Sequence, residues 1–337
     1  MNTEPTVVEQ FIVPHVAFTQ AEMQLEQSFR YSDTKGEAEG VPIVGESGAG
    51  KTSVLKSFHD KHPAHRTGDG LEVPILFASV PSAPTVKSLA GAMLAALGVP
   101  DPDRGTENEK TRRLQVLIRE THTQMVMIDE FQHFVDQGTH KVMHHVADWL
   151  KVLIDSTQAT LVVAGLPSCM AVIDQNPQLA RRFCAPMFMP RFDWRVQADR
   201  RQFCAIVRAF HKPLSKRYLT PDLGAEDMAF RFYLASGGLI GFLAKLLRQV
   251  ERNCASRNNL TITIEDLHAA HMQAIWYSQR NPDLPRPFDK GFKLGAMADE
   301  LEAVGMIGTV PVGPVVSQRN VQVRKRARHV NDVLAAR

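Results

Sequence analysis

The stretch VPIVGESGAGKTSVL, residues 41–55, decides the fold. Residues 45–52 fit the pattern G-x-x-x-x-G-K-[ST] at every required position. The apolar residues 41–44 predict the end of a buried strand, and residues 53–62 predict the helix that follows. A glycine loop between a strand and a helix directs backbone N–H groups, and the helix N-terminus, at a phosphate group. The sequence therefore predicts a nucleotide-binding P-loop.

The residue types in this loop assign the expected contacts. Lys51 would reach the β- and γ-phosphates, and the Thr52 hydroxyl would hold Mg²⁺. The backbone of the loop and the first turn of the helix would hold the remaining phosphate oxygens. The predicted nucleotide-binding residues in this stretch are Gly45, Glu46, Ser47, Gly48, Ala49, Gly50, Lys51, Thr52 and Ser53.

A second stretch, TQMVMIDEF at residues 123–131, supplies the acids that such a loop needs. Residues 125–128 predict an apolar strand that delivers Asp129 and Glu130 to its carboxyl end. An acid in the first position completes the Mg²⁺ shell with Thr52, and the next acid can polarise an attacking water. We therefore expect Asp129 in the nucleotide and metal site, Glu130 as the hydrolytic base, and ATP and Mg²⁺ as cofactors.

The composition is that of an ordinary soluble domain. The chain has 337 residues, of which 44% are apolar and 22% charged, and its net charge of +3 argues neither for nor against nucleic acid. The four cysteines show no C-x-x-C spacing, which favours reduced packing residues over a disulfide framework or a zinc site. A run of about eighteen apolar residues and a signal peptide are both lacking, so we expect a cytoplasmic protein without a membrane segment.

The chain divides into parts by its pattern of strands and helices. Strands alternate with helices over residues 41–192, which predicts a parallel sheet with helices on both faces. Thr85 predicts a helix N-terminus, and Thr106 with Glu109 predicts a capping box. The predicted parts are a lead-in at 1–40, an α/β core at 41–192, a helical module at 193–280, and a linker with a basic tail, RKRAR at 324–328, within 281–337.

Several further stretches carry a more specific resemblance. A P-loop core followed by a small all-α lid is the layout of AAA+ ATPases, and the sequence resembles the TniB/TnsC family within them over roughly residues 10–280. That family comprises AAA+ regulators of transposition, used by transposons with a DDE transposase, including CRISPR-associated ones. The stretches that carry the resemblance are ENEKTRRLQVLIRE (107–120), MIDEFQHF (127–134), LVVAGLPS (161–168), PQLARRF (177–183), PRFDW (190–194) and SGGLIGFLAKLL (236–247).

The resemblance implies a function and a set of partners. Members of this family assemble with ATP on double-stranded DNA as rings or helical filaments, without reading its sequence. They link a TniQ-type targeting protein to the DDE transposase, and ATP hydrolysis releases them. The resemblance thus implies a homo-oligomer that binds duplex backbone.

The resemblance also assigns site residues. Lys51 and Thr52 match the Walker A positions, and Asp129 and Glu130 match the Walker B positions. Arg181 and Arg182 match the place of an arginine finger, whose planar, permanently charged fork stabilises charge on a neighbouring subunit's γ-phosphate. Between the two arginines the sequence favours Arg182 narrowly; both could instead be solvated surface charges.

Two positions depart from the AAA+ pattern. Gly165-Leu166 stands where many of these enzymes have a polar sensor residue, and Ile240 stands where a second sensor arginine is often found. Lys245, about one turn further along, is the expected substitute. Both departures predict slow hydrolysis that DNA or a partner stimulates.

Duplex DNA would be gripped through its phosphates by cations, hydroxyls and helix N-termini. The region between the second and third core strands offers such groups, although an ordinary solvated helix face would look the same. The basic tail at 324–328 is either solvated or an auxiliary contact. The predicted DNA-binding residues are Thr85, Lys87, Thr106, Lys110, Arg112 and Arg113.

Other interpretations stay open at this stage. A helicase loader or remodelling ATPase would share the core, and a nucleotide-binding signalling module would need no DNA contact. His133, His140, His144 and His145 lack cysteine or carboxylate partners at a metal-site spacing, which favours solvated or packing roles. Trp149 and Trp194 are expected in the core. The adenine pocket is expected near residues 13–16 and the lid.

Overall fold

A parallel sheet of five strands forms the centre of the α/β core. The computed structural model describes residues 6–32, 38–68, 70–257, 260–275, 284–292, 297–305 and 307–308. The sheet has the strand order β4-β5-β6-β1-β7, and all its neighbouring strands are parallel. Its strands are β1 (Gly40–Gly45), β4 (Ile75–Ser79), β5 (Met125–Asp129), β6 (Thr160–Gly165) and β7 (Met187–Met189); β2 (His65–Arg66) and β3 (Leu71–Glu72) form a separate hairpin.

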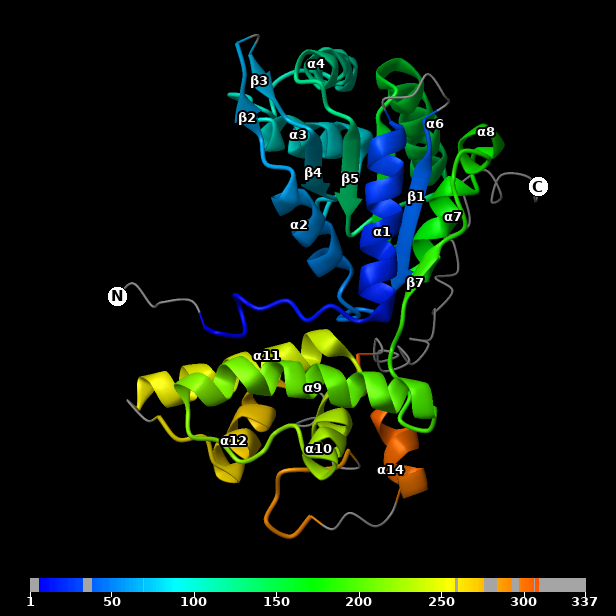
Figure 1. Ribbon diagram of the computed structural model, residues 1–337. Helices are drawn as coiled ribbons and strands as arrows, with labels where there is room; N and C mark the ends of the chain where they lie inside the picture. The colour runs from blue at the N-terminus through cyan, green and yellow to red at the C-terminus, as the bar shows by residue number, and fades with distance from the viewer. Residues whose placement is uncertain are drawn as a thin grey trace, which may run out of the picture.

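Helices cover both faces of this sheet, as the alternating pattern predicted (Figure 1). One apolar cluster joins the sheet to α3 (Val86–Ala96), α4 (Glu107–Glu120) and α6 (His140–Thr157). The opposite cluster joins it to α1 (Val16–Tyr31) and α2 (Lys51–Lys61). Successive strand residues contribute to opposite clusters because side chains alternate between the faces of a strand. Short helical segments lie between these elements: α5 (His133–Asp136), η1 (Pro167–Cys169), α7 (Met170–Ile173) and α8 (Pro177–Ala180).

The helical lid has a hydrophobic cluster of its own. It consists of α9 (Gln197–Arg217), α10 (Glu226–Ser236), α11 (Ile240–Ser256) and α12 (Ile264–Ala274), and α14 (Met297–Val304) follows in the chain. Val304 and Ile307 belong to the same cluster, so the lid reaches past its predicted end at residue 280. Trp194 is buried here and Trp149 is buried in the core, which confirms both as packing residues. The basic tail lies outside the described residues.

The segment before the sheet is divided between the two lobes. Residues 6–15, which we term the N-terminal strap, pack on the lid: Val8 and Val13 belong to the lid cluster. The backbone N–H groups of Val7 and Val8 donate to the carboxylate of Glu251 at 3.1 and 2.9 Å. Glu251 lies on α11 and is buried. The strap therefore crosses the junction between core and lid (Figure 1).

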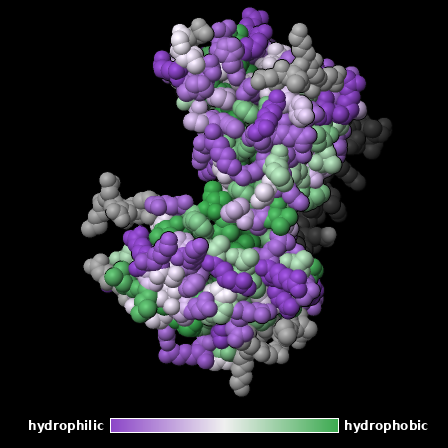
Figure 2. Space-filling model, in the orientation of Figure 1, coloured by the Kyte–Doolittle hydropathy of each residue, from purple (hydrophilic) through white to green (hydrophobic). Residues whose placement is uncertain are grey.

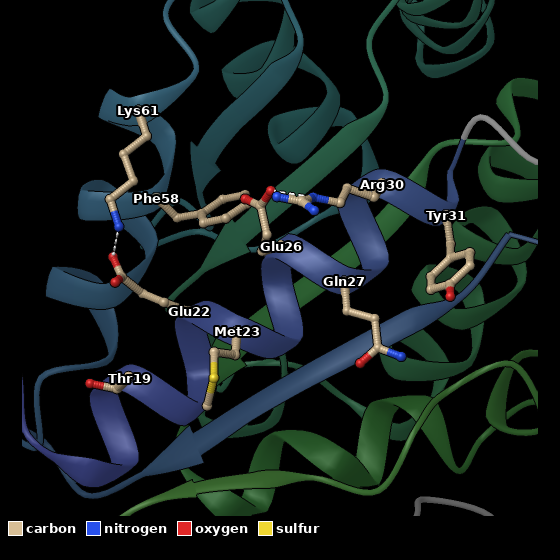
Figure 3. Close-up of a pocket in the computed structure, with 9 residues that line it drawn as sticks. All are labelled: Thr19, Glu22, Met23, Glu26, Gln27, Arg30, Tyr31, Phe58 and Lys61. Carbon is tan, nitrogen blue, oxygen red and sulfur yellow. Dashed lines mark hydrogen bonds and ion pairs between the residues drawn. The ribbon is translucent and has the colours of Figure 1, made fainter.

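Helix α1 continues from the strap but packs on the core. Phe18, Ala21 and Leu25 bury its inner face against the sheet. On its outer side Glu22 accepts from Lys61 of α2 at 2.7 Å, and Figure 3 shows the two side chains meeting across the helix pair. The predicted lead-in at 1–40 is thus two units, because its apolar residues serve two different cores.

The surface view agrees with this division. Figure 2 shows hydrophobic residues gathered where the two lobes meet, while the outer faces are mostly hydrophilic. In the described part of the chain, no single helix is long and apolar enough to cross a membrane. Only α10 and α11 taken together meet that length and composition, and they bend by 105° at their junction.

Candidate nucleotide-binding site

The P-loop runs from the end of β1 to the start of α2, with Gly48 and Gly50 at positive φ. Lys51 is buried, and its Nζ donates to the backbone carbonyls of Gly45 at 2.8 Å and Glu46 at 2.9 Å. Burial lowers the pKa of this ammonium, while Glu130 and Asp129 act in the opposite direction. The lysine is therefore held across the loop, where phosphate oxygens could replace the two carbonyls.

Thr52 and Asp129 come together beside the loop. The Thr52 hydroxyl donates to Asp129 Oδ2 at 2.7 Å, although 77 residues separate them in the chain. Burial raises the pKa of the Asp129 carboxyl, and the Thr52 hydrogen bond opposes this shift. A hydroxyl and a carboxylate in contact at a P-loop are the hard oxygen ligands that Mg²⁺ takes in phosphate sites, so this donor pair fits the metal.

Glu130 follows at the carboxyl end of β5 in the left-handed region, with φ +57. Its Oε2 accepts from Gln132 Nε2 at 2.5 Å, and Gln132 Oε1 accepts from the backbone N–H of Leu166 at 3.2 Å. A Cβ on Gly165 would stand 2.7 Å from Gln132 Oε1. The absence of a side chain at 165 thus makes room for Gln132, which brings a polar group to the end of β6.

Arg191 joins the P-loop to the lid, and sequence reasoning missed it. Its Nε donates to Glu46 Oε1 at 3.0 Å, and its Nη1 donates to the Gly237 carbonyl at 2.8 Å. Its Nη2 reaches the Ile307 carbonyl at 2.6 Å. The signal was its place in PRFDW directly after β7, where the chain leaves the core for the lid.

The lid meets the phosphate loop through glycine. The Gly241 N–H donates to the Gly48 carbonyl at 2.8 Å, and a Cβ on Gly241 would lie 2.8 Å from that same oxygen. Only glycine allows this approach, since a Cβ does not tolerate that distance from a backbone oxygen. The start of α11 is thereby fixed against the P-loop.

A pocket of about 220 Å³ lies where the strap, α2 and α11 meet. Lys245, the predicted lid cation, is exposed and does not line it. Arg248 does, because it follows Ile240 and Ala244 at intervals of four residues on one helix face. Two residues from the stretch where the adenine pocket was expected, Val13 and His15, line this pocket.

The structure separates the two finger candidates. Arg182 is mostly buried and its Nη2 lies 2.6 Å from Asp155 Oδ1 in the same chain. Arg181 is exposed, and among the described residues no ion pair engages it. A residue that reaches into a neighbouring subunit must be free to leave its own surface, so the geometry favours Arg181, the reverse of the sequence-based preference.

The predicted DNA-binding group is corrected at one residue. Lys110 is 2% exposed, with Nζ 3.4 Å from Asp103 Oδ1 and packed against Gly91. A buried lysine cannot reach a phosphate, so Lys110 is structural. Thr85 and Thr106 accept from the backbone N–H groups of Ser88 and Glu109, which confirms both caps but commits those oxygens to their helices.

The three other cations predicted to bind DNA are accessible on the surface. Lys87, Arg112 and Arg113 are all exposed on the neighbouring helices α3 and α4. Among the described residues no ion pair involves any of them. The structure thus leaves a smaller basic group than the sequence suggested.

The histidines near the site have ordinary partners. His133 Nδ1 lies 3.1 Å from the Val80 carbonyl, and His145 Nε2 lies 2.7 Å from Glu107 Oε1. His144 lies one turn from Asp148, at 3.6 Å, and near His140. Within the described residues no group of three or more histidine, cysteine or acidic side chains could hold a metal ion.

Comparison with known proteins identifies a matching family and similar folds. The family model described as "Bacterial TniB protein" matches residues 6–194. Cdc6p from Pyrobaculum aerophilum is similar in structure, with 14% identity, a TM-score of 0.57, and coverage of 81% of this chain and 72% of that one. The ORC2 protein of Aeropyrum pernix, solved as ADPNP–ADP complexes, is also similar in structure. It has 14% sequence identity and a TM-score of 0.57, with coverage of 80% of this chain and 72% of that one. No curated protein matches.

The family match spans more than half of the chain, and it includes the P-loop, the acids at the end of β5 and both candidate finger arginines. The two similar structures share the AAA+ arrangement of a parallel sheet flanked by helices and followed by a helical region. The chain belongs to the TniB family, and its fold is that of the AAA+ ATPases.

Proposed function

We propose that this protein is an ATP-dependent regulator of DNA transposition that assembles on double-stranded DNA and leaves it when ATP is hydrolysed. One observation carries the proposal: in a TniB-family chain, the fold brings Lys51, Thr52, Asp129 and Glu130 to one loop at the carboxyl edge of the sheet. That arrangement suits phosphoryl chemistry, which depends on positioning and on neutralising charge.

Each residue has a role in the proposed reaction. Lys51 would exchange its two backbone carbonyls for the β- and γ-phosphates, and Thr52 and Asp129 would hold Mg²⁺. A metal ion held there would supply positive charge against the phosphate oxygens. Glu130 orients the attacking water, and the hydrogen bond from Gln132 restrains its carboxylate. The backbone N–H groups of residues 46–50 complete the cradle.

The finger completes the site from a second subunit. Arg181 is exposed and forms no ion pair within the described part of the chain, which supports its insertion beside the γ-phosphate of a neighbouring copy in a ring or filament. Hydrolysis then depends on assembly. We propose Arg182 as the residue that anchors this segment to α6 through Asp155.

Duplex DNA is the proposed support for that assembly. Lys87, Arg112 and Arg113 supply backbone contacts, and Thr85 and Thr106 lie at helix N-termini beside them. Such contacts neutralise phosphates without reading bases. The bound oligomer would connect a TniQ-type targeting protein to the DDE transposase.

Binding to a random-sequence duplex tests the proposal. The protein is titrated against a fluorescent 40-base-pair duplex with ATP and Mg²⁺, with ADP, or without nucleotide, over a salt series. We expect cooperative binding that needs ATP and weakens with salt. Protein that binds the DNA phosphates displaces counterions from them, and a higher salt concentration opposes this release. Lys51→Ala should abolish it, whereas Lys56→Ala, an exposed lysine on the same helix, should leave it intact.

Each contrary result has a clear meaning. Binding that ignores the nucleotide, or that Lys51→Ala preserves, would contradict the proposed ATP switch. Preference for single strands over duplex would support a helicase loader or remodeller instead.

A further inference from the structure

The pocket between strap and lid has the composition of a ligand site. Its walls are mainly apolar, with contributions from the strap (Val8, Val13), from α9 (Phe210) and from α11 (Ile240, Ala244). Gly50 and Ser53, at the start of α2, form the end that adjoins the phosphate loop. Apolar walls with a few polar groups are usual in small-molecule pockets. At about 220 Å³ the pocket suits part of a nucleotide, with the phosphates outside it on the loop.

The pocket has a phosphate end and a far end. Gly241 is hydrogen-bonded to Gly48, so the start of α11 marks the phosphate end. Arg248 lies eight residues after Ile240 on the same helix face, which places it about 12 Å along the axis at 1.5 Å per residue. A nucleotide with its phosphates on the P-loop would extend its base toward Arg248.

Arg248 is a half-buried residue that lines the pocket. Among the described residues no hydrogen bond or ion pair engages its guanidinium. The nearest acid of the strap is not available to it, because Glu9 Oε1 lies 2.8 Å from Arg252 Nη2. A guanidinium offers five N–H donors and no acceptor. The far end of the pocket therefore presents donors that a ligand acceptor can satisfy.

His15 supplies a second polar group without a partner. Only 8% of the residue is exposed, and its Nδ1 is buried with no hydrogen-bond partner in the described chain. Leaving such an atom unsatisfied is costly, and each case calls for an explanation. Burial lowers the pKa of the imidazole to about 4, so at pH 7 it is neutral and one of its nitrogens can accept.

Together these two groups match one kind of base. Adenine carries ring nitrogens that accept and an exocyclic amine that donates, whereas guanine carries a carbonyl oxygen in place of that amine. Resting on the proposed function, we propose that Arg248 and His15 recognise the adenine of the bound nucleotide: Arg248 donates to a ring nitrogen, and His15 Nδ1 accepts from the exocyclic amine.

Calorimetric titration of the full-length protein with ATP, ADP and GTP tests the assignment. Arg248→Ala should weaken ATP and ADP alike, by about tenfold or more, because a hydrogen bond to a charged donor is lost from a group common to both. Arg248→Lys should recover part of the affinity. The matched control is Lys245→Ala, which removes an exposed cation from the same helix outside the pocket.

His15 is tested through selectivity rather than affinity alone. His15→Phe keeps an aromatic ring between Phe18 and Phe192 but removes the acceptor. The preference of the wild-type protein for ATP over GTP should fall by about tenfold in this variant. Its unfolding temperature without nucleotide is measured beside it, so that loss of folding is not read as loss of selectivity.

The contrary outcomes separate this inference from the proposed function. If the wild-type protein binds neither ATP nor ADP, the proposed function itself fails. If Arg248→Ala binds both like wild type, only the base assignment fails. If Arg248→Ala lost affinity for ATP but kept its affinity for ADP, Arg248 would lie at the γ-phosphate, and the inference would be overturned. Unaltered ATP preference in a folded His15→Phe variant would remove His15 from it.

Discussion

Gln132 and Glu130 are joined by a 2.5 Å hydrogen bond in which the amide donates to the carboxylate. The other end of the same amide is held by the Leu166 N–H at the end of β6. The carboxylate that we propose as the hydrolytic base is therefore tied to the neighbouring strand. Where many AAA+ enzymes place a polar side chain on that strand, this protein places glycine and lets Gln132 occupy the space.

This contact gives a first prediction. The hydrogen bond from Gln132 occupies one of the two carboxylate oxygens of Glu130 and holds the side chain in place. Gln132→Ala should therefore raise the basal rate of ATP hydrolysis several-fold without changing ATP affinity, as measured by phosphate release from the protein without DNA. Glu130→Gln is the reference, since it should bind ATP, hydrolyse it at least a hundredfold more slowly and stay longer on DNA. A slower Gln132→Ala enzyme would show that Gln132 positions Glu130 rather than restraining it.

Arg181 and Arg182, which follow α8, should respond differently to replacement by alanine. Arg181→Ala should lower DNA-stimulated hydrolysis by about a thousandfold, the usual effect of losing an arginine finger, and leave folding unchanged. Arg182→Ala should instead lower the free energy of unfolding by about 1–3 kcal/mol, because the ion pair between a mostly buried side chain and Asp155 is broken. Phosphate release and thermal unfolding measure the two effects.

Mixing subunits provides the control for the finger. Lys51→Ala protein lacks nucleotide but keeps Arg181, while Arg181→Ala protein binds nucleotide but lacks the finger. A mixture of the two should regain part of the activity that neither has alone. No recovery in a mixture that still assembles on DNA would argue against action between subunits.

The surface that contacts DNA can be located by removing positive charges from different parts of the protein and comparing the effects on binding. Removing Lys87, Arg112 and Arg113 together should weaken duplex binding, and the slope of log affinity against log salt should fall by about 0.9 for each lost phosphate contact. Lys110→Ala should leave that slope unchanged and lower stability instead, because Lys110 is buried. Affinity is measured by fluorescence anisotropy with ATP present.

Helix α9 offers a matched control of equal charge. Its exposed face carries Arg201, Arg208 and Lys212, which no ion pair engages within the described chain. Replacing these three by alanine should leave the slope near wild type. If this variant loses duplex binding and the α3–α4 variant keeps it, DNA lies along the lid.

Arg191 should couple nucleotide binding to the position of the lid. Arg191→Ala removes the link between Glu46 and the carbonyls of Gly237 and Ile307. We expect a loss of about 1–3 kcal/mol in the free energy of unfolding, since the bonds involve a charged donor, together with weaker ATP binding. Urea unfolding and calorimetry measure the two. Arg195→Ala, which breaks an exposed pair with Asp193, should change neither by much.

Two buried histidines predict a loss of stability in mild acid. Burial lowers the pKa of His15 and of His271 from 6.5 to about 4 in the folded protein. Between these two pKa values the unfolded chain therefore binds more protons than the folded protein. The free energy of unfolding has its full value above about pH 6.5 and falls as the pH drops toward 4. Each histidine should remove about 2 kcal/mol by pH 5.

Urea unfolding at pH 7.5 and pH 5 measures this dependence. His15→Phe should flatten it by about half, since one of the two groups no longer titrates. An equal acid loss in the variant and the wild type would assign the effect to other groups.

The sequence by itself determined the fold class and the chemistry of the phosphate loop. Residues 41–55 hold their strand, loop and helix locally, because glycine conformations, a helix N-terminus and an apolar run act over a few residues. The helix N-terminus at Thr85, the capping box at Thr106 and the alternation of buried strand residues are equally local, and the structure has them where the pattern placed them.

Only the tertiary structure decided which distant groups meet and which cations are free. Lys110 and Arg182 read as surface charges, but packing buries them against Asp103 and Asp155. Arg191 reaches three partners far along the chain, and Gln132 depends on the space left at Gly165. Such contacts depend on how the lobes, helices and neighbouring strands pack, and local patterns carry no information about that packing.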